Sequence, residues 1–319
     1  MKEMRRTIRR AGGRVLTAIV LTAVGTTTAS TQETARQRAG RRPTDWTAVE
    51  QALGRRGTMQ PGDVVRFSFP RHDLRVTAKG VELRPAFALG SWVAFKDVGG
   101  GHAMVMGDLV LTEDEVNTVI SRLQEGGVQQ TALHNHVLAE LPRIVYLHIA
   151  AHAEPQAVAR AIRSALETTK TPLDTATAAA VGVAAFELDT AQIARTLGYA
   201  GRVNGGVYQL SIPRAERITE GEREVPPSMG LGTVINFQPT GNGRAAITGD
   251  FVMTAREVNP VIRALRENGI EVTALHSHML DEQPRLFFMH FWANDVAAKL
   301  ARGLRAALDA TNSRRSPTR

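Results

Sequence analysis

The chain has 319 residues, of which 43% are hydrophobic and 22% are charged, values that are ordinary for a globular protein with room for two domains. The net charge of +8 resides in the first 42 residues, which contain ten Lys or Arg and two Glu. The rest of the chain holds 29 basic and 29 acidic side chains. Such a neutral body lacks the electrostatic surface for nucleic-acid binding, so we expect no nucleic-acid partner.

Residues 1–30 have the three parts of a secretory signal peptide. An arginine-rich stretch precedes an apolar run of 11 residues, Val15–Gly25, and small residues follow it. A helix needs roughly 20 residues to cross a bilayer, so we expect cleavage near Ala29 and no transmembrane span in the mature chain. The chain has no cysteine, which excludes disulfides, thiolate metal sites and the acylated cysteine of a lipoprotein. We therefore expect an exported protein, periplasmic or secreted.

After a tether, the same succession of predicted elements occurs twice. In the first copy it comprises a helix at 45–53, strands at 64–69 and 92–95, a hairpin turn at 99–101, a strand at 104–106, a Thr-capped helix from 112, a histidine-bearing strand after 131, a strand at 144–149 and a helix at 155–166. The second copy repeats them at 189–197, 207–212, 234–237, 241–243, 246–247, from 254, after 273, at 286–291 and at 295–308.

These elements predict two tandem homologous domains of the α+β class. Hairpin-joined strands with two to three helices per copy favour a mainly antiparallel sheet over a doubly wound parallel sheet. The expected divisions are a signal peptide at 1–30, a flexible tether at 31–44, a first repeat domain at 45–168, a linker at 169–187, a second repeat domain at 188–310 and a disordered tail at 311–319.

Each copy contains a histidine motif, H-x-H-x3-E followed by a third histidine. The first set is His134, His136, Glu140 and His148, and the second, 142 residues later, is His276, His278, Glu282 and His290. Side chains alternate along a strand, so the first two histidines of a set face the same way, about 7 Å apart at the backbone. A hairpin centred on Leu141 would place His148 opposite His134, and the same construction would place His290 opposite His276.

Three imidazoles on one sheet face can ligate a divalent ion. Nitrogen ligands without thiolates suit Zn, Mn, Fe, Ni or Cu. Six of the nine histidines fall in the two sets, so the pattern predicts one metal ion per copy. A buried network of structural histidines is the alternative interpretation.

Four further residues are candidates at such a site. Glu140 and Glu282 would be fourth ligands or catalytic acid/base groups if an early turn brought them back toward the histidines. Arg143 and Arg285 each follow a proline and are candidates to bind an anionic ligand through a bidentate contact. Pairing of these arginines with the nearby glutamates fits the sequence equally well.

Asp108 and Asp250 each follow a glycine shortly before a helix, which favours turn formers over metal ligands. An open coordination position would indicate a metal-dependent hydrolase or another metalloenzyme, and a closed one a binding protein for a metal or an unknown small molecule. The third alternative is a non-catalytic envelope scaffold. The sequence does not distinguish enzyme from binder.

The motifs together resemble the LppY/LpqO family of bacterial exported domains of unknown function. The resemblance rests on Gly-Asp before a Thr-capped helix, on Thr-Ala-Leu-His-[Asn/Ser]-His, on Glu-x-Pro-Arg and on the later histidine. It covers both copies, most of residues 45–310. The resemblance implies an exported protein of tandem domains and supplies no reaction, and the missing cysteine departs from the lipoproteins that the family name suggests.

Overall fold

A computed structural model describes residues 44–173 and 186–314, which form one compact unit. The predicted signal peptide, the tether up to residue 43, linker residues 174–185 and tail residues 315–319 lie outside the described residues. None of the helices in the described part of the chain combines the length and the apolar character that a bilayer-crossing helix requires.

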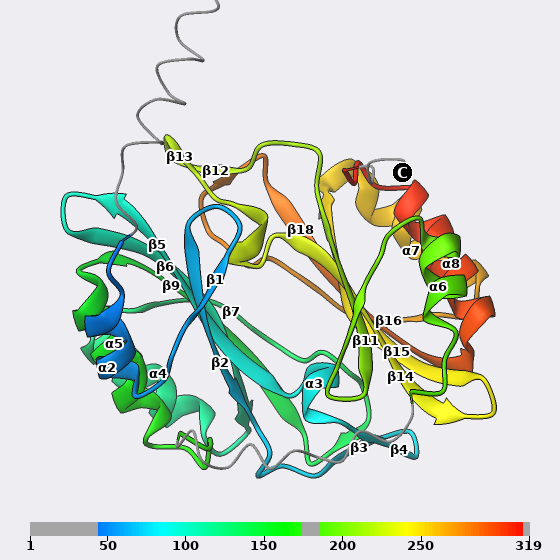
Figure 1. The fold of residues 1–319 in the computed structure, drawn as a ribbon, viewed down its shortest axis with the longest axis horizontal. Coiled ribbons are helices and arrows are strands. Elements are labelled where there is room, and N and C mark those ends of the chain that lie inside the picture. Colours follow the sequence, from blue (N-terminus) through cyan, green and yellow to red (C-terminus); the bar gives the residue numbers. More distant parts are fainter. Residues whose placement is uncertain (1–43, 174–185, 315–319) are drawn as a thin grey trace, which may run out of the picture. The chain divides into compact units, whose positions relative to one another are not determined.

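The first half is built on a six-stranded antiparallel sheet in the order β1-β2-β5-β6-β9-β7 (Figure 1). Its strands are β1 (Thr58–Gln60), β2 (Val64–Pro70), β5 (Gly90–Gly99), β6 (His102–Thr112), β7 (Gln129–His134) and β9 (Ile144–Ala153). The helices α2 (Thr47–Leu53), α4 (Val116–Glu125) and α5 (Pro155–Leu166) pack on one face of this sheet. Their apolar stripes, such as Val119 and Leu123 of α4, are buried there.

The second half repeats this arrangement in the order β10-β11-β14-β15-β18-β16. Its strands are β10 (Arg202–Asn204), β11 (Val207–Pro213), β14 (Gly232–Gly241), β15 (Arg244–Thr254), β16 (Glu271–His276) and β18 (Leu286–Val296). The helices α6 (Thr190–Leu197), α7 (Ala255–Glu267) and α8 (Ala297–Asp309) cover its outer face. Two similar, mainly antiparallel halves confirm the predicted α+β class.

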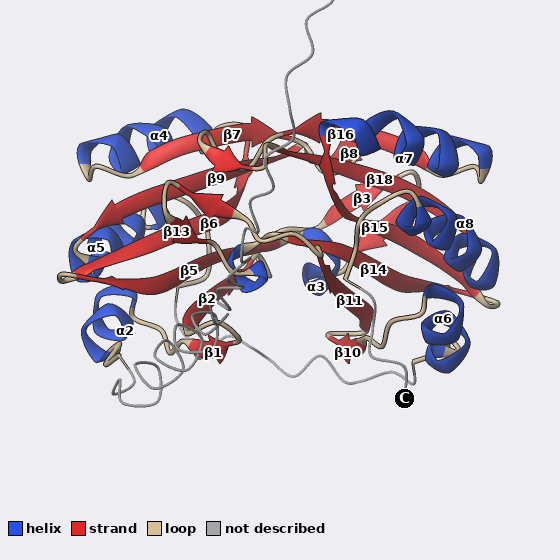
Figure 2. Ribbon diagram, turned by 90° about the horizontal axis from the view of Figure 1, so that it is seen from above, coloured by secondary structure: helices blue, strands red, loops and turns tan. Residues whose placement is uncertain are grey.

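The uncovered faces of the two sheets turn toward each other, with the helices on the outside (Figure 2). Each half sends an insertion across. The first-half insertion comprises β3 (Val76–Ala78), β4 (Val81–Leu83) and α3 (Pro85–Ala88), and it buries Phe87 against Trp292 of the second-half sheet. The second-half insertion comprises β12 (Thr219–Glu220), β13 (Arg223–Glu224) and the 3-10 helix η2 (Pro227–Met229), and it buries Met229 with Met104 of the first-half sheet.

This exchange gives the halves two cores in common in addition to the one that each has under its helices. Polar bonds reinforce it, because the Gln238 side chain accepts from the Arg84 amide at 2.9 Å and donates to the Glu82 carbonyl at 2.7 Å. The repeats are therefore two halves of one body, which the internal sequence comparison did not indicate.

Each insertion also pairs with a short strand of its own half. The strand β8 (Glu140–Leu141) adds to β4-β3, and β17 (Glu282–Gln283) adds to β13-β12. The peptide bonds Leu141–Pro142 and Gln283–Pro284, directly after these strands, are cis. The Glu-x-Pro-Arg motifs thus lie at the corners that lead back into β9 and β18.

Candidate metal centre

The six motif histidines lie in one cluster where the two sheets meet. His134 ends β7 and His148 lies in β9, and their counterparts His276 and His290 lie in β16 and β18. Each ring of one half packs against a ring of the other, stacked for His134 and His276 and tilted for the other two pairs. The centroid distances are 3.6 Å for His134 and His276, 3.8 Å for His136 and His290, and 3.7 Å for His148 and His278. The cluster therefore has an approximate twofold symmetry, with the His134–His276 pair at its centre.

The strand register that brings the rings together differs from the predicted one by two residues. Ala132 pairs with His148 and His134 pairs with Tyr146, whereas the hairpin centred on Leu141 placed His148 opposite His134. In the second half His276 pairs with Phe288 rather than with His290. The prediction was wrong because the corner at Glu-x-Pro-Arg holds the short strands β8 and β17 instead of a tight hairpin turn.

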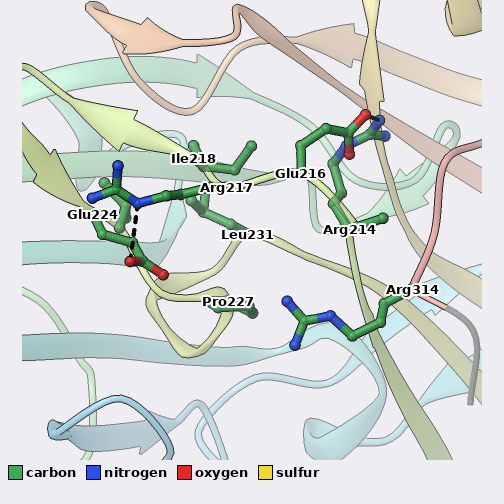
Figure 3. A pocket seen from close by; sticks show the side chains of 10 residues that line it. Arg214, Glu216, Arg217, Ile218, Glu224, Pro227, Leu231 and Arg314 are labelled. Carbon is green, nitrogen blue, oxygen red and sulfur yellow. Dashed lines mark hydrogen bonds and ion pairs between the residues drawn. The ribbon is translucent and has the colours of Figure 1, made fainter. Parts of the chain in front are cut away.

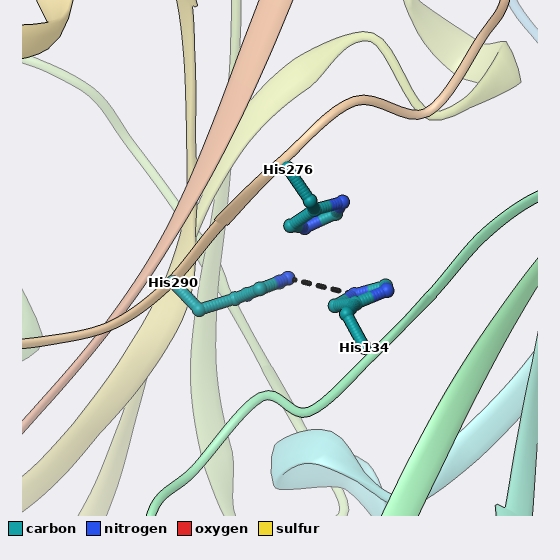
Figure 4. Close-up of side chains that lie close together, drawn as sticks. All are labelled: His134, His276 and His290. Carbon is teal, nitrogen blue, oxygen red and sulfur yellow. Dashed lines mark hydrogen bonds between the residues drawn. The ribbon is translucent and has the colours of Figure 1, made fainter.

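Ligand atoms close enough to share an ion come from both halves. His134, His276 and His290 form one such group (Figure 4). His148, His276 and His278 form the other, and in each group the ligand atoms lie within 4.8 Å of one another. His276 belongs to both groups. The grouping thus differs from the predicted arrangement of one ion held by the three histidines of each copy.

Backbone carbonyls orient several of the rings. Nδ1 of His290 lies 2.8 Å from the Gly249 carbonyl oxygen, and His148 bonds the backbone of Gly107, the equivalent residue. Nδ1 of His276 lies 3.2 Å from the Ser277 carbonyl oxygen. Hydrogen bonding of one ring nitrogen to a carbonyl leaves the other as an acceptor, which is how metal-ligating histidines are positioned.

Five of the six rings have a buried nitrogen that makes no hydrogen bond with any described residue. These atoms are Nδ1 of His134 and Nε2 of His136, His148, His276 and His278. A buried polar atom without a partner costs about 1–3 kcal/mol. The five atoms lie together in one cluster, where groups of three histidines could hold a metal ion.

Burial keeps the cluster uncharged. It lowers the pKa of each of the six imidazoles, to about 4 for His290. Neighbouring histidines lower the pKa further in every ring except that of His276. Neutral imidazole is the form that binds metal ions. The rings are therefore in the ligating protonation state at neutral pH.

Two aspartates complete the cluster. Asp108 lies 3.8 Å from His136 Nε2 and 4.0 Å from His148 Nε2, and Asp250 lies 3.2 Å from His278 Nε2. Burial, with the charge of Asp250 as the second cause, raises the pKa of Asp108 to about 7, and burial raises that of Asp250.

The prediction that these aspartates form turns was wrong, because both lie inside the long strands β6 and β15. The preceding glycines permit close strand approach rather than a turn, since a Cβ on Gly107 would come within 2.8 Å of the Trp92 carbonyl oxygen.

The glutamates lie at the edge of the cluster, outside the two ligand groups. Oε1 of Glu140 accepts from the Ile144 amide at 3.2 Å, and Oε1 of Glu282 accepts from the Leu286 amide at 2.8 Å. Burial raises the pKa of Glu140 to about 7. Both side chains thus stabilise the corner before the last strand of their half.

The two arginines differ from each other. Arg143 is 74% exposed and lies 3.4 Å from Glu113, whereas Arg285 bonds Glu282 at 3.2 Å and the carbonyl oxygens of Met279 and Leu280. Neither arginine is paired across the histidine cluster. Arg285 thus pairs with its nearby glutamate, as in the alternative interpretation, whereas Arg143 pairs with Glu113 rather than with Glu140.

A separate pocket of about 140 Å³ lies in the second half, beside Arg214, Glu216, Arg217 and Arg314 (Figure 3). Two of its arginines form salt bridges with glutamates. Arg214 is bonded to Glu216 at 2.7 Å, and Arg217 is bonded to Glu224 at 3.1 Å. The pocket does not include the histidine cluster.

Fold and site together define a class of protein. It has two α+β repeats with two hydrophobic cores in common, and one histidine cluster lies where the two sheets meet. Residues 47–168 and 191–310 both match the family described as Domain of Unknown Function (DUF1259), and the chain belongs to this family. A comparison with curated proteins finds no match.

Among solved structures, a trimeric bacterial microcompartment shell protein, PduB, is 13% identical, with 79% of this chain and 88% of that chain covered. EtuB from Clostridium kluyveri is 12% identical with the same coverage. The TM-score is 0.19 in both cases, too low to indicate a shared fold.

Proposed function

We propose that this protein binds one divalent transition-metal ion at a site shared by its two halves, with ligands drawn from His134, His276, His290, His148 and His278. The observation that carries the proposal is the set of buried ring nitrogens without hydrogen-bond partners among the described residues. Structural histidines in a buried network would have both nitrogens bonded. A metal ion replaces the missing partners with several coordinate bonds at once.

The chemistry of the donors limits the choice of ion. The site offers imidazole nitrogens and the nearby Asp108 and Asp250, and the chain has no cysteine. Such a set suits Zn, Cu, Ni, Fe or Mn and disfavours Ca and Mg, which prefer oxygen ligands. The halves would then be held together by the ion as well as by their common cores.

Metal analysis of the untagged protein tests the proposal. After equilibration with each of the five metals and removal of the excess, we expect about one equivalent per chain for at least one of them, because a single histidine nitrogen binds one ion and His276 serves both ligand groups. Two equivalents would instead support one ion per half. A chain that retains no metal from any of the five would support the scaffold with structural histidines.

We also infer that the chain is exported, from the leader at residues 1–30 and the resemblance to LppY/LpqO proteins. When the full chain is expressed in a bacterium with a secretion pathway, the periplasmic or secreted product should begin close to residue 30. Mass spectrometry of the intact protein measures this. Protein that stays in the cytoplasmic fraction with its leader attached would contradict export.

A further inference from the structure

The approximate symmetry of the cluster is broken where Tyr146 of the first half corresponds to Phe288 of the second half. His136 stacks on Tyr146 at a centroid distance of 3.3 Å, and in the second half His278 stacks on Phe288 at 3.4 Å. The two ring pairs have nearly the same geometry, with interplanar angles of 9° and 11°. At this position the two sides differ by one hydroxyl group.

That hydroxyl is buried and has no partner among the described residues. Tyr146 is 0% exposed and its hydroxyl oxygen makes no hydrogen bond there. Tyrosine normally finds a partner for its O–H group when it is buried. The phenol stacks on His136, and Asp108 lies 3.8 Å from Nε2 of the same histidine, so Tyr146 and Asp108 adjoin one ring. Burial raises the pKa of Tyr146, and the charges of Glu140 and Asp108 add to this effect.

The carboxyl groups show the same imbalance between the halves. Oε2 of Glu140 has no hydrogen-bond partner in the described chain, whereas Oε2 of its counterpart Glu282 is bonded by Arg285 at 3.2 Å. On the first-half side Asp108 stands 3.8 Å from its histidine, compared with 3.2 Å for Asp250 on the second-half side. The first-half side therefore has two unpaired polar atoms, the Tyr146 hydroxyl and Oε2 of Glu140, where the second-half side has a phenylalanine ring and a bonded carboxylate. The aspartates do not differ in this respect, since Oδ1 of Asp108 and Oδ1 of Asp250 both lack a hydrogen-bond partner among the described residues.

We propose that the first-half side of the cluster is the ligand-binding side, where the Tyr146 hydroxyl donates a hydrogen bond to a water-sized ligand on the bound metal. Asp108 and Glu140 would accept hydrogen bonds from that ligand when it is water. The second-half side would not bind such a ligand, since Phe288 offers no donor and Arg285 already bonds Glu282, the counterpart of Glu140. This inference rests on the proposed metal site and adds an exchangeable coordination position to it.

Tyr146→Phe tests the inference, and Phe288 shows that phenylalanine fits over the equivalent histidine. The metal-loaded protein is titrated with azide, a small anion that displaces water from a metal and accepts a hydrogen bond, and binding is followed in the visible spectrum of the Co(II) or Cu(II) form. We expect azide to bind the unaltered protein. In Tyr146→Phe the Kd for azide should rise about tenfold or more, the effect of one lost hydrogen bond to a charged group.

Phe288→Tyr is the matched control. It adds a hydroxyl group beside His278 but leaves Glu282 bonded to Arg285, so it should leave the Kd for azide unchanged. Metal content is measured for all three proteins, so loss of the metal site and loss of the ligand position give different results. An absence of metal in the unaltered protein would contradict the metal site itself. Three other results would overturn the proposal that the first-half side alone binds the ligand. They are bound metal without azide binding, equal Kd values for Tyr146→Phe and the unaltered protein, and tighter azide binding by Phe288→Tyr.

Discussion

Replacing His276 by alanine is expected to abolish stoichiometric metal binding. His276 is the one histidine common to both groups of ligand atoms, and its ring stacks on His134 at the centre of the cluster. Loss of an outer-shell partner alone typically weakens metal affinity 10- to 100-fold, so loss of this ligand should weaken it at least about 100-fold. Competition with a chelator of known affinity measures the change.

Two further variants make the assignment specific. His134→Ala removes a member of only one ligand group and leaves His148, His276 and His278 in place, so it should weaken binding less than His276→Ala. His72→Ala changes an exposed histidine outside the cluster and should have no effect. Equal losses in the His276 and His134 variants would show that the two groups do not share a ligand.

Metal should also stabilise the folded protein, by an amount that increases with the logarithm of its affinity. A ligand at 1,000 times its Kd adds about 4 kcal/mol to the free energy of unfolding. The unaltered chain and His72→Ala should therefore unfold at a higher temperature with metal than without it. The His276 variant should show no such rise, and a rise equal to that of the unaltered chain would contradict the proposed site.

The largest effect on stability is expected from Arg71→Met. Arg71 is 0% exposed, and its guanidinium bonds Asp73 at 2.8 Å, Glu115 at 2.8 Å and the Val110 carbonyl at 2.7 Å. Breaking a buried ion pair by removing one partner costs roughly 3–5 kcal/mol, because the remaining charge stays buried. That is a large part of a typical total stability of about 5–15 kcal/mol. Urea denaturation measures the loss.

The loss should depend on pH. Burial by itself would raise the pKa of Glu115, but its hydrogen bonds from Arg71, Lys170 and Thr112 lower it overall. A lowered pKa in the folded state means that the stabilisation is complete above the ordinary value for Glu, about 4.3, and disappears as the pH falls below it. The difference between the unaltered chain and Arg71→Met should therefore be full at pH 7 and shrink below about pH 4.

The repeat supplies matched controls. Arg214→Met removes the equivalent residue, which bonds Glu216, Glu257 and the Val252 carbonyl, and should cost a similar amount. Arg143→Met removes an exposed arginine and should cost less than about 1 kcal/mol. A small loss in Arg71→Met, similar to that of Arg143→Met, would show that the buried network adds little to stability.

Local structure followed from sequence patterns at several positions. The stripe of Val258, Val261 and Leu265 predicted the buried face of α7, and the Thr254–Glu257 capping box is present at its start. These features depend on residues three or four apart, which helical geometry brings together without help from the rest of the chain.

Patterns with two physical causes were less informative. Glycine before Asp108 is compatible with a turn and with close strand packing, and only the neighbouring strand β5 decides between them. The strand register at His134 depended on the length of the corner, and the corner is set by pairing with β3 in the distant insertion. The spacing of residues along the chain reveals neither the packing of β5 against Gly107 nor the pairing of the corner with β3.

The sequence by itself determined that there are two copies of one α+β repeat, that six histidines carry the shared motif and that the charge resides in the leader. It did so because repetition, alternation and composition are local properties. Only the tertiary structure decided that the copies share two cores. It also decided that His134 stacks on His276 of the other copy, so that the histidines form one cluster and not one separate site in each half. The uncovered apolar face of each sheet has to be buried, and burying it against the other half brings both sets of imidazoles to one place.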